Sequence, residues 1–478
     1  MAYTPTIGME VHAELKTATK MFCNSKNDAH EMRPNVNICP VCLAHPGTLP
    51  VINKEAVKHV LRVGIALGSE LADYTEFDRK NYFYPDLPKG YQISQYEFPL
   101  VSGGTLAGVQ ITRIHLEEDT ASSVHDSQTG ATLIDFNRSS MPLMELVTEP
   151  VIHSAEEAGK FGRELQLLLR YLGASDADME QGQMRLEANI SLSDTDKLGT
   201  KVEVKNINSF RAMERAVAYE IKRQTELLSK GEKVIQETRG WDDVKQQTFS
   251  QRVKEVAADY RYFPDPDLPS LKLSEIPEFS RENLAQTLPE LPDARRARYA
   301  SWGIKPADAE QFVQYPRIGS FFDAVAATKT GDAAFAQRAA NYIANDLVKI
   351  IRDTDSRDSE LSAEIPVSVE NFAKIIDLIG AGKISSRVAK DLLLMVIAER
   401  RDPESLATEK GLFQTSSAAD LGPTIDAILT EHTSVVADYK GGKEAALQFL
   451  FGQAMKVLKG AAEPATLRQA LIDAIAKK

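Results

Sequence analysis

The strictest pattern in this chain is the alternation of apolar and polar residues between positions 7 and 15. Side chains of a β-strand point alternately to its two faces, so this rhythm predicts a strand. One face carries Ile7, Met9, Val11, Ala13 and Leu15, and the other carries Glu10, His12 and Glu14. The rhythm returns at residues 185–192, with Arg185, Glu187, Asn189 and Ser191 on the polar face, and at residues 201–205, where Lys201, Glu203 and Lys205 alternate with valines. Such polar faces are either solvated sheet surfaces or a site for phosphate and a divalent cation.

Length and composition restrict the class of protein. A chain of 478 residues is too long for one core and predicts about three domains. No apolar run approaches the roughly 20 residues of a membrane span, and the first residues lack a basic and then apolar leader. With three cysteines, we expect a soluble protein of the reducing cytoplasm. The net charge of −12 argues against nucleic-acid binding over the whole surface.

Composition divides the chain into three segments. In residues 1–292 strands mix with a few helices, of which one follows the cap Ser154 and ends at Gly173 and another runs from Ser209 to about Lys230. Neither a GxGxxG nor a GxxxxGKS or GxxxxGKT motif occurs, so we expect an α+β domain with an antiparallel or mixed sheet. A proline-rich connector leads to a helical bundle in residues 293–408, and a small helical tail domain follows in residues 409–478.

Two further segments gather groups that can carry chemistry. Residues 79–95, RKNYFYPDLPKGYQISQ, combine aromatic rings, prolines and cations, and we expect them to form a rigid loop rather than a helix or a strand. Glu117, Glu118 and Asp119 are adjacent carboxylates, which repel one another unless water or a cation neutralises them. Structural packing and a wet surface remain the alternatives for both segments.

Seven blocks in order, and the tail, resemble one known family. The blocks are GMEVHAEL at 8–15, RKNYFYPDLPKGYQISQ at 79–95, HLEEDTA at 115–121, DFNRSSMPLMELVTEP at 135–150, EANIS at 187–191, EVKNINSF at 203–210 and DYRYFPDPDL at 259–268. The tail sequence is DYKGGKEAALQFLFGQAMKVLKG at 438–460. Together they are similar to the B subunits of glutamine-dependent aspartyl/glutamyl-tRNA amidotransferases over the full length of the chain.

The resemblance implies a cradle-like catalytic domain and a role in a cytoplasmic heterotrimer. An amidase, the A subunit, would release ammonia from glutamine, and a small C subunit would wrap the other two. The B subunit would use ATP to activate the side-chain carboxyl of Glu on tRNA(Gln) or of Asp on tRNA(Asn), which ammonia then amidates. The chain itself has no Ser-rich amidase signature, in agreement with this division of labour.

The same resemblance implies roles for particular residues. His12, Glu118 and Glu145 would hold one Mg²⁺ beside ATP, and Glu10 and Glu187 would contribute to a second cation site. Glu187 stands where the family has an aspartate, so its carboxylate reaches one methylene further. The candidates for contacts with phosphate or substrate are Lys80, Lys89, Lys205 and Asn206, and the candidate catalytic residues are His12, Glu118, Glu145 and Lys205.

The cysteines resemble a zinc knuckle that is found in some family members. That knuckle carries C-x-C followed by C-x-x-C, whereas this chain has Cys23, Cys39 and Cys42 with Ser25 at the remaining position. A structural Zn²⁺ needs four ligands, and His30 or His45 would have to supply the fourth. We therefore expect a packed loop with three reduced thiols, with Zn²⁺ as the alternative.

The tail is the candidate tRNA-reading module. Lysines interleaved with glycines would allow close approach to an RNA surface, and the candidate contacts are Lys440, Lys443, Lys456 and Lys459. The alternative is an amphipathic bundle with solvated lysines. For the whole chain, the alternatives to an ATP-dependent amidotransferase subunit are a non-catalytic RNA-binding scaffold and a free-standing metal-dependent phosphohydrolase.

Overall fold

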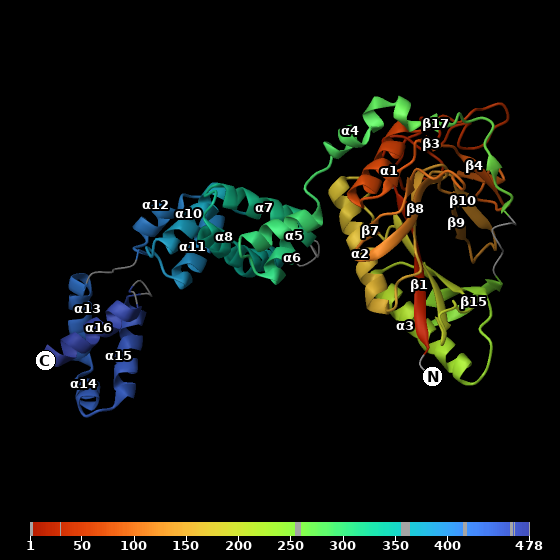
Figure 1. Ribbon diagram of the computed structural model, residues 1–478. Coiled ribbons are helices and arrows are strands. Elements are labelled where there is room, and N and C mark those ends of the chain that lie inside the picture. The colour runs from red at the N-terminus through yellow and green to blue at the C-terminus, as the bar shows by residue number, and fades with distance from the viewer. Residues whose placement is uncertain are drawn as a thin grey trace. The chain divides into compact units, whose positions relative to one another are not determined.

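The computed structural model describes residues 3–28, 30–253, 260–354, 364–413, 418–458, 462 and 464–477. The chain forms two compact units, residues 1–292 and residues 293–478. A sheet with helices makes up the first unit and helices make up the second, which confirms the predicted α+β class with a helical C-terminal region (Figure 1). The division at residue 408 stays a prediction. No helix in the described part of the chain is long and apolar enough to cross a membrane.

The first unit is built around a ten-stranded sheet in the order β15-β14-β13-β12-β1-β11-β8-β6-β2, with β7 paired to β8 beside this path. Every pairing is antiparallel except the parallel pair β13–β14, so the sheet is mixed. Its strands are β1 (Thr4–Glu14), β2 (Glu70–Leu71), β6 (Val101–Ser102), β7 (Thr105–Leu106), β8 (Val109–Glu118), β11 (Pro142–Thr148), β12 (Met184–Ser193), β13 (Val202–Ile207), β14 (Glu237–Asp242) and β15 (Gln247–Val253).

Smaller elements complete this unit. The short strands are β3 (Tyr74–Thr75), β4 (Asp78–Asn81), β5 (Tyr91–Ser94), β9 (Ser122–His125), β10 (Thr132–Asp135), β16 (Phe263–Pro264) and β17 (Leu271–Lys272). The helices are α1 (Lys54–Ala66), α2 (Ala155–Leu172), α3 (Phe210–Ser229) and α4 (Arg281–Ala285), with 3-10 turns at Leu273–Glu275 and Pro277–Phe279.

The core lies between the sheet and helices α1, α2 and α3, which cover one of its faces (Figure 1). The apolar side of β1 is completely buried there, as its alternation predicts. Both predicted helix starts are confirmed, because the Ser154 hydroxyl accepts from the Glu157 backbone and the Ser209 hydroxyl accepts from the Ala212 backbone. Gly173 ends α2 with a φ of 63°, a conformation that favours glycine. The opposite face of the sheet is left for polar groups.

The expectation that residues 79–95 form only a loop is wrong at both ends of the segment. β4 and β5 pair as an antiparallel hairpin, with Lys80 opposite Gln92 and Asn81 opposite Tyr91. Both prolines of the segment lie between these strands, where they disturb no hydrogen-bond ladder. The hairpin and β16 form a three-stranded sheet beside the large one.

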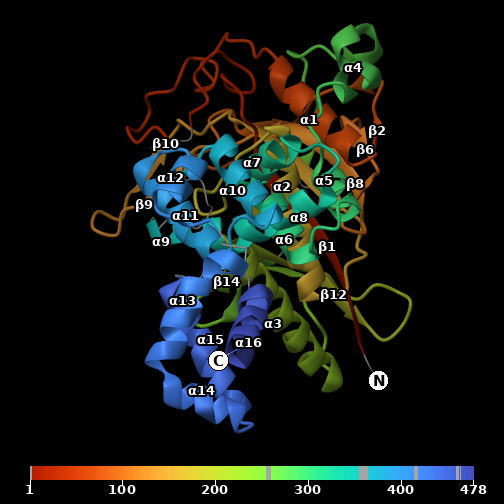
Figure 2. The same ribbon diagram turned by 90° about the vertical axis from the view of Figure 1, so that its left-hand side faces the viewer.

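In its described residues the second unit consists of helices joined by turns and short loops. Its helices are α5 (Pro292–Ser301), α6 (Pro306–Gln314), α7 (Pro316–Ala327), α8 (Ala333–Tyr342), α9 (Val348–Thr354), α10 (Val369–Gly380), α11 (Ser386–Glu399), α12 (Pro403–Glu409), α13 (Ala418–Glu431), α14 (Thr433–Lys440), α15 (Glu444–Val457) and α16 (Pro464–Lys477), with a π-helical turn at Ile343–Leu347. Helices α13 to α16 pack around a hydrophobic cluster of their own, which extends from Leu421 to Ile475 (Figures 1 and 2).

Candidate active site

The polar face of the large sheet brings together residues from distant parts of the sequence. In the antiparallel register, His12 of β1 lies opposite Arg185 of β12 on one side and Glu145 of β11 on the other. Glu145 in turn lies opposite His115 of β8. Side chains directly opposite each other on one face lie about 5 Å apart, so this register builds a row of ionisable groups across four strands.

A first cluster forms around this row and consists of His12, Glu117 and Glu145; we call it the histidine cluster. One potential ligand atom from each residue lies within 4.8 Å of the others. His12 Nε2 is 3.3 Å from a Glu145 oxygen and 3.6 Å from a Glu117 oxygen. His115 Nε2 lies 3.3 Å from the same Glu145 oxygen.

The electrostatics of the histidine cluster favour positive charge. Burial would lower the pKa of His12, but the carboxylates of Glu145 and Glu117 raise it to about 9. Burial would likewise raise the pKa of Glu145, yet His115 and His12 hold it well below its usual range. Glu145 is therefore ionised. A divalent cation that replaced the proton of His12 could be held by its imidazole together with the two buried carboxylates.

A second cluster lies in the neighbouring rows of the sheet and consists of Glu10, Glu187 and Glu203; we call it the glutamate cluster. Its ligand atoms also lie within 4.8 Å of one another. Lys205 Nζ lies 2.8 Å from a Glu187 oxygen and 3.8 Å from a Glu203 oxygen. Burial would lower the pKa of Lys205, but these carboxylates raise it. Three carboxylate oxygens suit a hard cation. The ammonium group of Lys205 already neutralises part of their negative charge.

The structure does not place Glu118 with His12 and Glu145, contrary to the prediction from the sequence. Glu118 points to the other face of β8, where its carboxylate lies 2.6 Å from Lys89 Nζ and accepts from the Ile93 backbone N–H at 2.9 Å. Its neighbour Glu117 takes the expected place in the histidine cluster. The reason is the alternation of the strand, in which buried Ile114 and Leu116 fix the core face and leave His115 and Glu117 on the opposite face.

Both clusters line a cavity of about 510 Å³. Lys80 lines this cavity, and its Nζ lies 5.2 Å from the centre of the Tyr260 ring. Burial would lower the pKa of Lys80, but Glu117 raises it. Lys89 is not among the lining residues because it pairs with Glu118. Asn206 lies in β13, and its side chain is outside the described part of the structure.

Aromatic rings and ion pairs between side chains form the remaining walls of the cavity. The rings that line the cavity are Tyr82, Tyr96, Tyr260 and Tyr262, and Tyr96 and Tyr262 stack with centroids 4.5 Å apart. Asp119 sits at another edge, where Arg185 Nη2 donates to it at 2.9 Å and Arg138 Nε donates at 2.6 Å. The pKa of Asp119, which burial would raise, is lowered by these two arginines.

Sequence reasoning missed several residues of this site. Glu117 and His115 could have been found from the parity of β8, and Glu203 from its alternation with Val202 and Val204. Arg113, which also lines the cavity, shares that parity. Tyr260 and Tyr262 belong to the block at 259–268, but no local pattern places them at the cavity, because the fold brings them there from beyond β15.

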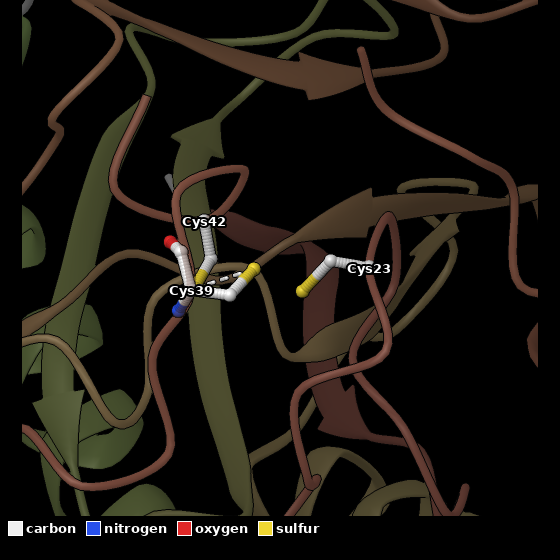
Figure 3. A group of neighbouring side chains, drawn as sticks. All are labelled: Cys23, Cys39 and Cys42. Atoms are coloured by element: carbon white, nitrogen blue, oxygen red, sulfur yellow. Dashed lines mark hydrogen bonds between the residues drawn. The ribbon is translucent and has the colours of Figure 1, made fainter. Parts of the chain in front are cut away.

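The three cysteines lie together, as Figure 3 shows, and none of them lines the cavity. Their sulfur atoms are within 4.8 Å of one another, and Cys39 and Cys42 are 3.8 Å apart. Ser25 Oγ lies 3.9 Å from Cys42 Sγ and so stands beside the thiols in place of a fourth cysteine. Three thiols with a hydroxyl do not make the closed tetrahedral set that a structural zinc ion requires.

The structure separates the tail lysines. Lys440 ends α14, and Lys443 precedes α15 and pairs with Asp438 at 2.9 Å. Lys456 lies thirteen residues along the chain from Lys443, toward the other end of α15 and therefore about 20 Å away. All three are exposed, whereas Lys459 is outside the described residues.

Comparison with known proteins shows the family to which the chain belongs. A family model described as the GatB/GatE catalytic domain matches residues 5–277, and another described as the GatB domain matches residues 320–475. The chain therefore belongs to the GatB family. The chain is 44% identical to the aspartyl/glutamyl-tRNA(Asn/Gln) amidotransferase subunits B of Thermomicrobium roseum and Thermus thermophilus, and 41% identical to that of Carboxydothermus hydrogenoformans. Each comparison covers 99% of both chains.

Proposed function

We propose that this protein is the activating and amide-forming subunit of a tRNA-dependent amidotransferase. Its substrates would be ATP, ammonia, and Glu on tRNA(Gln) or Asp on tRNA(Asn). The observation that carries the proposal is the convergence of the histidine cluster and the glutamate cluster on one cavity. The names of the relatives, which match along nearly their whole length, support the same reaction.

The reaction explains why such a cavity is needed. A carboxylate resists attack by ammonia because its leaving group would be oxide. A side-chain oxygen of Glu or Asp first bonds to the terminal phosphorus of ATP as the bond to ADP breaks. The ammonia nitrogen then bonds to the acyl carbon, the bond to phosphate breaks, and the nitrogen loses a proton. In both steps negative charge develops on the reacting oxygens, and positioned cations must stabilise it.

The chain's own residues would divide this work between the two clusters. His12, Glu117 and Glu145 would hold one Mg²⁺, and Glu10, Glu187 and Glu203 would hold a second cation or orient Lys205. Bound Mg²⁺ would supply charge neutralisation at the phosphates. Lys80 and Lys205 would contact phosphate or substrate oxygens, and the tyrosine rings would shield the site from water. Lys89 and Glu118 would brace the β4–β5 hairpin against β8.

The remaining parts of the reaction would come from partners. The chain would work in the cytoplasm as the B subunit of a heterotrimer, with an amidase A subunit that supplies ammonia and a small C subunit. The tail helices α13 to α16 would approach the tRNA through Lys440, Lys443 and Lys456, and Lys459 is a further candidate. Lys440 and Lys443 form one contact point and Lys456 another, so recognition would follow the shape of the tRNA.

The decisive experiment measures ATP hydrolysis that depends on misacylated tRNA, together with the amidated product, in the reconstituted heterotrimer. His12→Ala should abolish both and Glu117→Gln should strongly reduce both at limiting Mg²⁺, while Glu156→Gln, a change of an exposed acidic residue on α2, should leave them unchanged. Full activity in His12→Ala and Glu117→Gln would leave a binding scaffold as the better description. Turnover of simple phosphoesters without the partner subunits would favour a phosphohydrolase.

A further inference from the structure

One arginine of the cavity has no assigned role in the function proposed above. Arg113 lies on β8 with the same parity as His115 and Glu117, and it lines the cavity. Its Nε is buried and has no hydrogen-bond partner among the described residues. A guanidinium group has five N–H donors and stays charged in a protein, so a buried unpartnered N–H calls for an acceptor.

Two other cations of the cavity are paired with carboxylates, and a third lies over an aromatic ring. Arg185 donates to Asp119 at 2.9 Å, and Lys205 lies 2.8 Å from Glu187. Lys80 lies over the ring of Tyr260. The structure shows no ion pair between Arg113 and any described carboxylate, although six carboxylates line the same cavity. Its charge is therefore available for a ligand.

The register defines where such a ligand would lie. Arg113 is two residues from His115 along β8, a separation of roughly 7 Å on the same face. It lies opposite Val147, which lies opposite Glu10, so two strand spacings of nearly 5 Å each separate it from the glutamate cluster. An anion held by Arg113 would thus lie beside both clusters, where a bound divalent cation could share its oxygens.

We propose that Arg113 binds the terminal phosphate of ATP. This inference rests on the proposed function. A guanidinium group matches phosphate by two parallel N–H···O bonds, and an arginine beside a transferring phosphoryl group stabilises the charge that develops on it. Among the anionic groups of the reaction, the terminal phosphate is the one that must sit between the cations and the acceptor carboxylate. ADP lacks this phosphate, so Arg113 would contribute little to the affinity for ADP.

The test measures nucleotide binding rather than activity alone. In the intact heterotrimer, isothermal titration would give the affinities of the Mg²⁺ complexes of ADP and of a non-hydrolysable ATP analogue with an intact terminal phosphate. Arg113→Gln should lower the affinity for the analogue by about 10- to 100-fold, which is the range of a charge-assisted hydrogen bond. It should lower the affinity for ADP by less than about threefold. Arg113→Lys should recover part of the loss because it keeps the charge without the planar fork.

Arg163→Gln is the matched control, because it makes the same charge change on α2 at a partly exposed arginine that is paired with Glu214. It should leave both affinities unchanged. Thermal melting of each variant separates binding from folding, and Arg113→Lys decides the matter if Arg113→Gln does not fold.

Several results would overturn the assignment of Arg113. Equal losses for ADP and the analogue would place Arg113 at another part of the nucleotide. A raised KM for aminoacyl-tRNA with unchanged analogue affinity would assign it to the acceptor carboxylate. A lower melting temperature with unchanged affinities would make it purely structural. By contrast, failure of the wild-type heterotrimer to bind either nucleotide would remove the proposed function itself.

Discussion

The adjacent carboxylates Glu117 and Glu118 allow a direct test of the register of β8. They differ by one position in sequence and by one face of the sheet in structure. Glu117 belongs to the histidine cluster, whereas Glu118 is paired with Lys89 on the other face. Glu117→Gln and Glu118→Gln are the same chemical change, so each variant is the control for the other.

The structure gives the expected size of the Glu118→Gln effect. The Glu118 side chain is 1% exposed, and it accepts from Lys89 Nζ at 2.7 Å and from the Ile93 backbone N–H at 2.9 Å. A neutral amide leaves the Lys89 ammonium group, whose side chain is 13% exposed, without its counterion. Breaking a buried ion pair in this way costs about 3 to 5 kcal/mol, and the residual exposure of Lys89 favours the lower value. For a domain of this size about 3 kcal/mol lowers the melting temperature by roughly 6 °C.

Glu117→Gln should show the opposite pattern. Its carboxylate accepts from the Ser94 hydroxyl at 3.1 Å and lies 3.6 Å from His12, contacts that an amide can partly keep. The melting temperature should therefore change little, while loss of a charged ligand should raise the Mg²⁺ concentration needed for half-maximal ATP turnover by at least about tenfold.

The assay combines thermal melting with Mg²⁺ titration of tRNA-dependent ATP hydrolysis in the heterotrimer. Glu118→Gln should have a lower melting temperature than the wild type. The Mg²⁺ concentration for half-maximal ATP hydrolysis should stay at the wild-type value. A raised Mg²⁺ midpoint in Glu118→Gln with a normal midpoint in Glu117→Gln would refute the register and restore the ligand set expected from the sequence.

Three further changes test other parts of the molecule. Ser25→Cys should complete a four-thiol set and raise Zn²⁺ affinity at least about tenfold, measured by competition with a chromophoric chelator; equal affinities in wild type and variant would contradict this geometry. Tyr262→Leu removes a ring from the cavity wall and should weaken binding of ATP or aminoacyl-tRNA by about 1 kcal/mol or more, whereas Tyr262→Phe should not; titration of both ligands identifies which one stacks there. Lys440→Ala combined with Lys443→Ala should raise the KM for tRNA and reduce its salt dependence, without changing ATP affinity; an unchanged KM would show that these lysines are only solvated.

Much of the large sheet could be predicted because its side chains alternate between two faces with a period of two residues. The alternation of residues 7–15 placed Glu10 and His12 on one face of β1, and the structure shows them there. The caps Ser154 and Ser209 likewise fixed the starts of α2 and α3, because each hydroxyl satisfies a backbone N–H that the helix leaves free. Local rules suffice where the partner is close in sequence.

The predicted grouping of Glu118 with His12 and Glu145 differs from the structure because of strand alternation. A resemblance between motifs identifies a run of carboxylates but does not state which face each one occupies. The buried positions of Ile114 and Leu116 carry that information, because in this part of β8 even-numbered residues face the core and odd-numbered residues face the cavity. The hairpin of β4 and β5 was also not predicted. The two prolines in its loop indicated a loop over the whole segment, although short strands lie on both sides of them.

The positions that no local rule gives are those that depend on strand pairing. His12, Glu117 and Glu145 lie on three strands that are separated by long stretches of chain, and only the antiparallel registers of β1, β11 and β8 align them. A slip of one residue between β1 and β11 would turn Glu145 into the core and bring Met144 or Leu146 to the cavity. Because burial of those two apolar side chains opposes the slip, the hydrophobic core also specifies the candidate metal ligands. A variant that weakens this packing should therefore lose Mg²⁺ affinity before it loses the fold.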